Sequence, residues 1–169
     1  MLRFEKMTVK AQEALQEAQE IAASHQNQSV EPLHLLAALT QQADGVVPPL
    51  LARLGIRPEQ LSQELEREIG RLPKVQGFGQ QNLGRALNDV LEKAFDEAAK
   101  FKDEYVSTEH MFLAIAGADR DPAGQLLKRS GASYEAILQA LAGVRGSQRV
   151  TSQTPEAKIS ASSIPPRCR

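Results

Sequence analysis

The chain has 169 residues, of which 41% are hydrophobic and 24% charged, with 20 basic residues against 21 acidic ones. This composition is typical of a globular protein and excludes a fibrous or low-complexity chain. The formal charge of −1 lacks the basic excess that binding to nucleic acid or to an anionic membrane requires. We therefore expect no nucleic-acid partner and no membrane partner.

The single cysteine, Cys168, lies one residue from the C-terminus. One cysteine forms neither an intrachain disulfide nor a thiolate metal cluster. The first residues have mixed charge and no apolar core segment, and no stretch approaches the roughly 20 apolar residues of a membrane span. These observations predict a cytoplasmic location.

An internal repeat is the most informative feature of the sequence. At an offset of 76 residues the chain matches itself without a gap from about residue 15 to residue 65. The matched pairs include Leu15/Leu91, Ala18/Ala94, Ala22/Ala98, His34/His110, Leu51/Leu127 and Gly55/Gly131. Most are small or apolar, so the repeated feature is a packing scheme, and two copies are too few for a long solenoid. We expect a single all-α domain of two four-helix halves related by a pseudo-twofold axis.

The first helix of each half is indicated by an apolar stripe. Leu15, Ala18 and Ala22 are spaced i, i+3 and i+7, and the same stripe recurs over residues 87–98. Alanines on a stripe permit close approach of a neighbouring helix. Each half therefore opens with one long amphipathic helix.

The other helices are delimited by prolines, capping residues and glycines. Their starts are indicated by Pro32 and by Ser107 or Thr108 for the second helix, Pro48 and Asp121-Pro122 for the third, and Pro58 and Ser133 for the fourth. Gly55 and Gly131 are each followed by an apolar residue, as in a Schellman-type helix end. The sequence therefore predicts eight helices.

Two segments interrupt the helical pattern. Residues 73–82 contain Pro73, Gly77 and Gly79 without a helical period, which indicates a connector between repeat 1 (about 5–72) and repeat 2 (about 83–145). Residues 146–169 are rich in Ser, Thr, Gln, Pro and Gly, and they predict a disordered linker that adds no core element. The expected domain therefore spans residues 1–145.

No pattern of catalytic or cofactor-binding residues is evident. The stretch from Gly79 to Gly84 has the glycine spacing of a phosphate loop, but Arg85 and Ala86 replace the required Lys and Ser/Thr. His34 and His110 occupy one position in the two repeats, as duplicated packing or capping residues would, whereas a zinc site needs three or four ligands. We expect no catalysis, no metal and no bound nucleotide in this chain.

The aromatic residues suggest a surface for partners. Phe101 and Tyr105 are expected to close the core at the end of the long helix. Phe95 lies one residue off the stripe and Phe78 lies in the connector, and for both the pattern leaves burial and exposure open. If exposed, they would form an apolar site for unfolded chain.

A family pattern is carried by six parts of the sequence: Thr8, Ala18–Gln19, Val30–Leu39 (VEPLHLLAAL), Pro49–Leu51, Arg71–Gly77 (RLPKVQG) and Val106–Ile115 (VSTEHMFLAI). In this order they resemble the duplicated N-terminal domain of Clp/Hsp100 AAA+ chaperones, over residues 1 to about 146. The RLPKVQG connector is more similar to that of ClpB-type disaggregases than to the shorter connector of ClpA and ClpC unfoldases.

The resemblance implies a substrate-engaging domain of an ATP-dependent chaperone that disaggregates and remodels stress-denatured proteins. Its partners would be unfolded or aggregated polypeptides, with adaptor or co-chaperone proteins as a further class. The parent protein would be a hexamer whose ATP and Mg bind outside this chain, while the chain alone would be a monomer. The family's polypeptide groove carries over to Thr8, Leu91, Asp103 and Glu109, and the position of Phe95 adds that residue. Lys93, Glu97 and His110 at neighbouring positions depart from an apolar groove.

Two other functions are compatible with parts of the sequence. One is an adaptor-docking domain of a proteolytic Clp unfoldase, which would bind a folded partner only. The other is a small autonomous enzyme, which the missing catalytic constellation disfavours.

Overall fold

The computed structural model describes residues 3–76, 81–146 and 150–153. These residues form eight α-helices, one short 3-10 helix and two strands of two residues each. The helices are α1 (Val9–Ser24), α2 (Pro32–Gln41), α3 (Val47–Arg53), α4 (Pro58–Gly70), α5 (Arg85–Lys100), α6 (Thr108–Ala116), α7 (Pro122–Arg129) and α8 (Tyr134–Arg145). The 3-10 helix is η1 (Phe4–Lys6), and the strands are β1 (Ser29–Val30) and β2 (Asn82–Leu83). The predicted all-α fold with eight helices is confirmed, whereas Gly77, Phe78, Gly79 and Cys168 lie outside the described residues.

The two halves are joined by equivalent backbone contacts. Val30 pairs with Leu83 in the parallel β1–β2 ladder, and Met7 pairs with Val106 in an isolated parallel bridge. A shift by the 76-residue offset takes Val30 to Val106 and Met7 to Leu83, so each contact is the image of the other. This exchange confirms the predicted pseudo-twofold relation. Strands this short have no period of their own, and the sequence did not predict them.

The helix ends follow local chemistry. In α2 the Glu31 side chain accepts from the backbone of His34, and the His34 ring accepts from the Glu31 N–H. Ser107 and His110 make the same reciprocal pair at the start of α6. The duplicated histidines are therefore capping residues, one of the two roles that their repeat position predicted.

Glycines end the third helix of each half. Gly55 and Gly131 have φ of 73° and 96°, a region in which only glycine is free of strain. The N–H of Ile56 donates to Leu51 and that of Ala132 to Leu127, as in a Schellman ending. The predicted stops are thus correct in both position and type.

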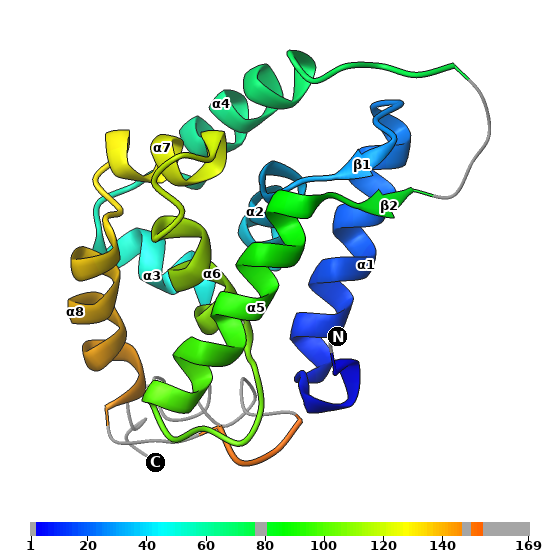
Figure 1. The fold of residues 1–169 in the computed structure, drawn as a ribbon. Helices are drawn as coiled ribbons and strands as arrows, with labels where there is room; N and C mark the ends of the chain where they lie inside the picture. Colours follow the sequence, from blue (N-terminus) through cyan, green and yellow to red (C-terminus); the bar gives the residue numbers. More distant parts are fainter. Residues whose placement is uncertain (1–2, 77–80, 147–149, 154–169) are drawn as a thin grey trace, which may run out of the picture.

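The core is built around α2 and α6. Eight residues of α2 and all nine of α6 are buried, as expected for helices that other helices surround. Figure 1 shows α2 and α6 at the centre, with α1 and α5 to the right and in front, α3 and α8 to the left, and α4 and α7 above. Within the described ranges, no helix is both long and apolar enough to cross a membrane.

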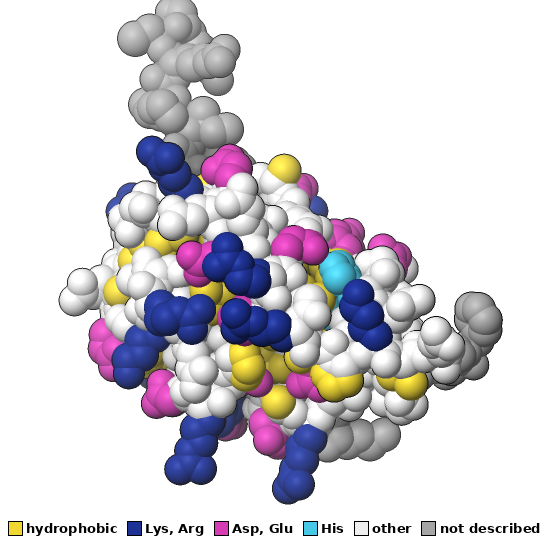
Figure 2. Space-filling model, turned by 90° about the horizontal axis from the view of Figure 1, so that it is seen from above, with side chains coloured by type: hydrophobic (Ala, Val, Ile, Leu, Met, Phe, Trp, Pro, Cys, Tyr) yellow, Lys and Arg dark blue, Asp and Glu magenta, His cyan; other side chains and the backbone are white. Residues whose placement is uncertain are grey.

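The surface carries few large apolar side chains. Among the residues that the structure describes, those with large exposed apolar side chains are Phe4 (47%), Val9 (40%) and Val75 (42%). On the face over α4 and α7, Figure 2 shows hydrophobic side chains as small separate patches among charged ones. This face therefore offers no broad apolar groove.

Candidate functional site

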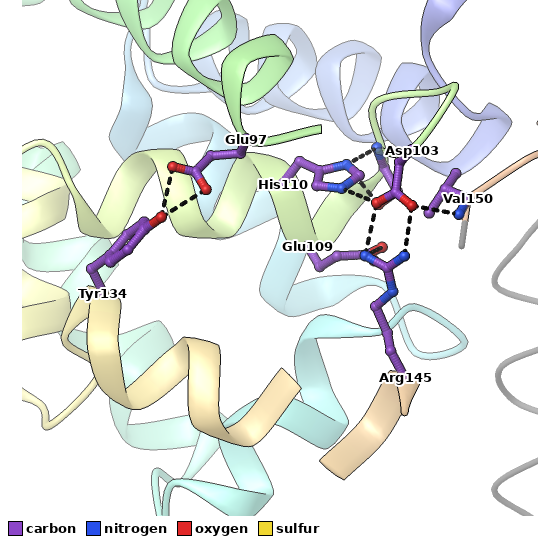
Figure 3. A network of polar contacts seen from close by, with 8 residues as sticks. Glu97, Asp103, Glu109, His110, Tyr134, Arg145 and Val150 are labelled. Atoms are coloured by element: carbon purple, nitrogen blue, oxygen red, sulfur yellow. Dashed lines mark hydrogen bonds and ion pairs between the residues drawn. The ribbon is translucent and has the colours of Figure 1, made fainter. Parts of the chain in front are cut away.

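A buried cluster of charged side chains lies where the loop after α5, the start of α6 and the end of α8 meet (Figure 3). The Asp103 carboxylate accepts from the two terminal guanidinium nitrogens of Arg145, Nη2 at 2.8 Å and Nη1 at 2.9 Å, and from His110 Nε2 at 2.7 Å. The side chains of Asp103 and His110 are fully buried, and that of Arg145 is 4% exposed. Desolvation of a buried ion costs several kcal/mol, so each charge here is stable only because an oppositely charged or hydrogen-bonding partner lies beside it. We call Asp103, Glu109, His110 and Arg145 the charged cluster.

Hydrogen bonds set the ring tautomer of His110 and the charge of Asp103. The Ser107 N–H donates to His110 Nδ1 at 2.9 Å, which leaves the ring proton on Nε2, facing Asp103. Burial alone would raise the pKa of Asp103, but hydrogen bonds from His110, Arg145 and the Val150 N–H outweigh burial and lower this pKa to about 2. Asp103 is therefore an anion at neutral pH.

Glu109 is the member of the cluster with unused hydrogen-bonding capacity. Its Oε1 lies 3.6 Å from Arg145 Nη1, and its side chain is 1% exposed. Neither carboxylate oxygen accepts a hydrogen bond from the part of the chain that the structure describes. A buried acceptor without a donor is costly, so Glu109 stands out from the structural ion pairs around it.

Ser107, His110 and Asp103 superficially resemble a catalytic triad. Ser107 Oγ lies 3.1 Å from His110 Nδ1, and His110 Nε2 lies 2.7 Å from Asp103. However, Ser107 is fully buried and its hydroxyl caps α6. A nucleophile must reach its substrate, so this arrangement acts as a helix cap.

Repeat 1 has a neutral version of the same arrangement. Asn27 stands at the position of Asp103 and accepts from His34 Nε2 at 2.9 Å, and Leu33 stands at the position of Glu109. The uncharged Asn27 side chain is therefore enough to accept the hydrogen bond of the capping histidine, His34. The charges of repeat 2 therefore exceed what packing requires, which makes the cluster the candidate functional site.

A segment beyond α8, Val150–Gln153, lies against the cluster, and we call it the linker segment. The Val150 N–H donates to Asp103 at 2.8 Å, its C=O accepts from the Glu104 N–H at 2.8 Å, and its side chain is fully buried. The Gln153 C=O accepts from the Val9 N–H at 2.8 Å. The prediction of a disordered linker is wrong for this segment, because burial and backbone hydrogen bonds offset the entropy of ordering it.

Three of the five predicted binding residues lie at or near the cluster. Asp103 and Glu109 belong to it. Thr8 caps α1 by accepting from the Ala11 N–H at 3.1 Å, and its own N–H donates to Val106, so it joins α1 to the segment before α6. The structure thus brings Thr8 near the cluster, while contact of these residues with a polypeptide stays a prediction.

The other two predicted residues lie on α5. Leu91 is fully buried in the core, as its apolar stripe indicates, and Phe95 is partly buried against that core. A groove lined by Leu91 is not exposed in this conformation, because α5 packs this face against α6. The prediction that Leu91 lines a binding groove is therefore wrong, and Leu91 is a core residue.

A second polar contact fastens α8 to α5. The Tyr134 hydroxyl donates to Glu97 at 2.8 Å, and Lys100 lies 3.1 Å from the same carboxylate. Glu97 is 6% exposed, so its charge is held by these partners. Residues 3–76, 81–146 and 150–153 contain no group of three or more His, Cys, Asp or Glu side chains that could hold a metal.

Arg145 and Val150 were not predicted from the sequence. Arg145 has the usual position of a solvated cation in the last turn of a helix, and Val150 is one apolar residue within a polar stretch. Neither pattern distinguishes them from exposed residues. Their burial depends on Asp103, which lies 42 residues before Arg145.

Comparison with known proteins places the chain among chaperone domains. Residues 6–130 match the family model of the Clp repeat N-terminal domain. The ClpB chaperone of Clostridium perfringens is 38% identical over 165 residues, and that of Nitratidesulfovibrio vulgaris is 45% identical over 159. These alignments cover 95% and 89% of this chain but 19% and 18% of the relatives, so the chain spans about a fifth of their length.

Solved structures agree on the fold. The N-terminal domain of Hsp104 from Candida albicans has a TM-score of 0.79 at 24% identity, covering 89% of this chain and 99% of that one. The ClpV N-domain in complex with a VipB peptide has a TM-score of 0.67 at 19% identity, covering 82% of this chain and 86% of that one.

Proposed function

The chain belongs to the Clp repeat N-terminal domain family, and on this premise we propose that it is the substrate-engaging domain of a ClpB-type chaperone. In this proposal it binds unfolded or aggregated polypeptide and passes it to an ATP-driven ring that disaggregates stress-denatured proteins. The domain itself performs no catalysis and holds no cofactor. ATP, Mg and hexamer formation belong to modules outside this chain, and the protein acts in the cytoplasm.

The observation that carries this proposal is the similarity to ClpB chaperones over nearly the whole chain, at 36–45% identity for the relatives described by that name. The charged cluster supports it, because it contains Asp103 and Glu109, two of the positions to which the family resemblance assigns polypeptide binding, whereas repeat 1 has the uncharged Asn27 and Leu33 at these positions. A polypeptide partner also fits the solved ClpV N-domain, which was found with a peptide of VipB.

A binding experiment with one polypeptide in two states tests the proposal. Reduced, carboxymethylated α-lactalbumin is unfolded, and native α-lactalbumin has the same sequence in a folded state. Fluorescence anisotropy with this chain should show saturable binding of the unfolded form and none of the native form. Equal binding of both, or binding of neither, would contradict the proposal.

Adaptor docking is the second candidate. The fold is shared with ClpV N-domains and with the ClpD N-domain of Arabidopsis thaliana, and the VipB complex has a defined peptide as its ligand. In that case the chain would bind one folded partner and ignore unfolded α-lactalbumin.

A further inference from the structure

We propose that a binding edge for unfolded polypeptide is formed by Asp103, Glu104, Val9 and Glu5. The linker segment occupies this edge as a resident ligand, and client polypeptides displace it. This inference rests on the proposed function, because it names the place at which the chain engages its substrate. The ligand class is any unfolded chain with an aliphatic side chain at the position of Val150.

The edge binds the linker segment mainly through hydrogen bonds to the backbone of that segment. Asp103 accepts the Val150 N–H and Glu104 donates to the Val150 C=O, both at 2.8 Å. Val9 donates its N–H to the Gln153 C=O at 2.8 Å, and the Glu5 C=O accepts from the Gln153 side-chain amide at 3.3 Å. Three of the four contacts use the main chain of the ligand.

Main-chain recognition does not depend on the sequence of the ligand. Besides the buried Val150 side chain and the Gln153 side-chain amide, the linker segment offers the edge only its backbone, which bends at Ser152 and Gln153, while the Thr151 side chain is exposed. This suits a receptor for unfolded chains of many sequences. The same property lets the chain's own linker segment compete for the edge.

The charged cluster keeps the edge ready when the linker segment leaves. Arg145 and His110 together donate three hydrogen bonds to Asp103 that do not involve Val150. The carboxylate therefore stays oriented and charged as an acceptor for another backbone N–H. In repeat 1 the equivalent residue, Asn27, is uncharged, and its amide N–H donates to the Pro73 C=O. Of these two equivalent positions, only Asp103 of repeat 2 provides a charged acceptor.

Apolar surface continues from the edge. Phe4 and Val9 are two of the three large apolar side chains that are most exposed among the described residues. Phe4 precedes Glu5 and Val9 begins α1, and the backbones of Glu5 and Val9 hold Gln153. A client longer than the linker segment would cover them and gain affinity from the buried area.

A pair of variants with the same added charge tests the inference. Val150→Asp puts a carboxylate beside Asp103 in a buried position, so it should release the linker segment. Thr151→Asp adds the same charge at an exposed position and is the matched control. Val150 lies outside the main hydrophobic core cluster, so the helical circular dichroism of both variants should equal that of the parent.

Two readouts are needed, the hydrogen exchange of the Val9 and Glu104 amides and the affinity for reduced, carboxymethylated α-lactalbumin. In Val150→Asp both amides should exchange faster, and the affinity should rise about three- to tenfold, because the competing occupant is gone. In Thr151→Asp both quantities should match the parent.

Each other outcome has a different meaning for the edge and for the client. Faster exchange with unchanged affinity would place client binding elsewhere while leaving the proposed function intact. Unchanged exchange in Val150→Asp would refute the docking of the linker segment. Absence of binding in all three proteins would refute the proposed function together with this inference.

Discussion

Replacing Asp103 by Asn should destabilise the domain, and the size of the effect follows from the hydrogen bonds of the charged cluster. The ordinary pKa of 3.8 is lowered to about 2 by the donors that surround the carboxylate. At 1.36 kcal/mol for each pKa unit, the charged form contributes about 2 kcal/mol to folding. The Asn side chain would also point an amide donor at Arg145, His110 and Val150, which are donors themselves, so the loss of stability in Asp103→Asn should be at least this large.

The pH dependence of this effect has a defined sign. Because the folded pKa is depressed, the contribution of Asp103 is complete above pH 3.8 and is lost as the pH falls through about 2. The parent and Asp103→Asn should therefore differ by at least about 2 kcal/mol at pH 7, or about 5–10 °C in Tm for a domain of this size. The difference should shrink below pH 3.

Urea unfolding followed by circular dichroism at pH 7 and pH 2 measures both quantities. Asp96→Asn, at an exposed position on α5, removes the same charge without a partner and should change stability little. If Asp103→Asn is as stable as the parent at pH 7, or if its deficit is undiminished at pH 2, the reasoning about the cluster is wrong.

Three further predictions concern the histidine cap and the helix packing. Burial lowers the pKa of His34 to about 4, so as the pH falls His34 is protonated in the unfolded chain before it is protonated in the folded one. The free energy of unfolding should therefore fall by up to about 3 kcal/mol between pH 6.5 and pH 4. His34→Gln keeps the helix cap and should remove this fall in urea unfolding. Gly124→Ala should cost about 1–3 kcal/mol in thermal unfolding, because its Cβ would meet the backbone of Ala118, while Gly70→Ala has open space and should cost nothing. Leu91→Ala should cost about 2–5 kcal/mol in urea unfolding, as a fully buried residue, and a cost below 1 kcal/mol would argue for an exposed groove position.

The helices and their ends were predictable because their signals are local. Pro32, Asp121 and Gly131 each act through the backbone within a few residues, so one sequence contains the whole argument. The pseudo-twofold relation was predictable from the repeat. The parallel pairing of Val30 with Leu83 was not, since two-residue strands have no period.

The candidate site was only partly predictable. The resemblance indicated Thr8, Asp103 and Glu109, but the charge pair between Asp103 and Arg145 joins positions 42 residues apart, and no local pattern links them. For Leu91 two predictions conflicted, and the apolar stripe was the correct guide to burial. Cluster formation depends on tertiary packing, which a single sequence does not display.

Client polypeptide should bind at the edge that the linker segment now occupies. The most direct test is an NMR titration of the isotopically labelled chain with reduced, carboxymethylated α-lactalbumin. The amide signals of Val9, Glu104 and Val150 should shift together and saturate at one client concentration. Shifts confined to other surfaces, such as the face over α4 and α7 in Figure 2, with these three signals unchanged, would contradict it.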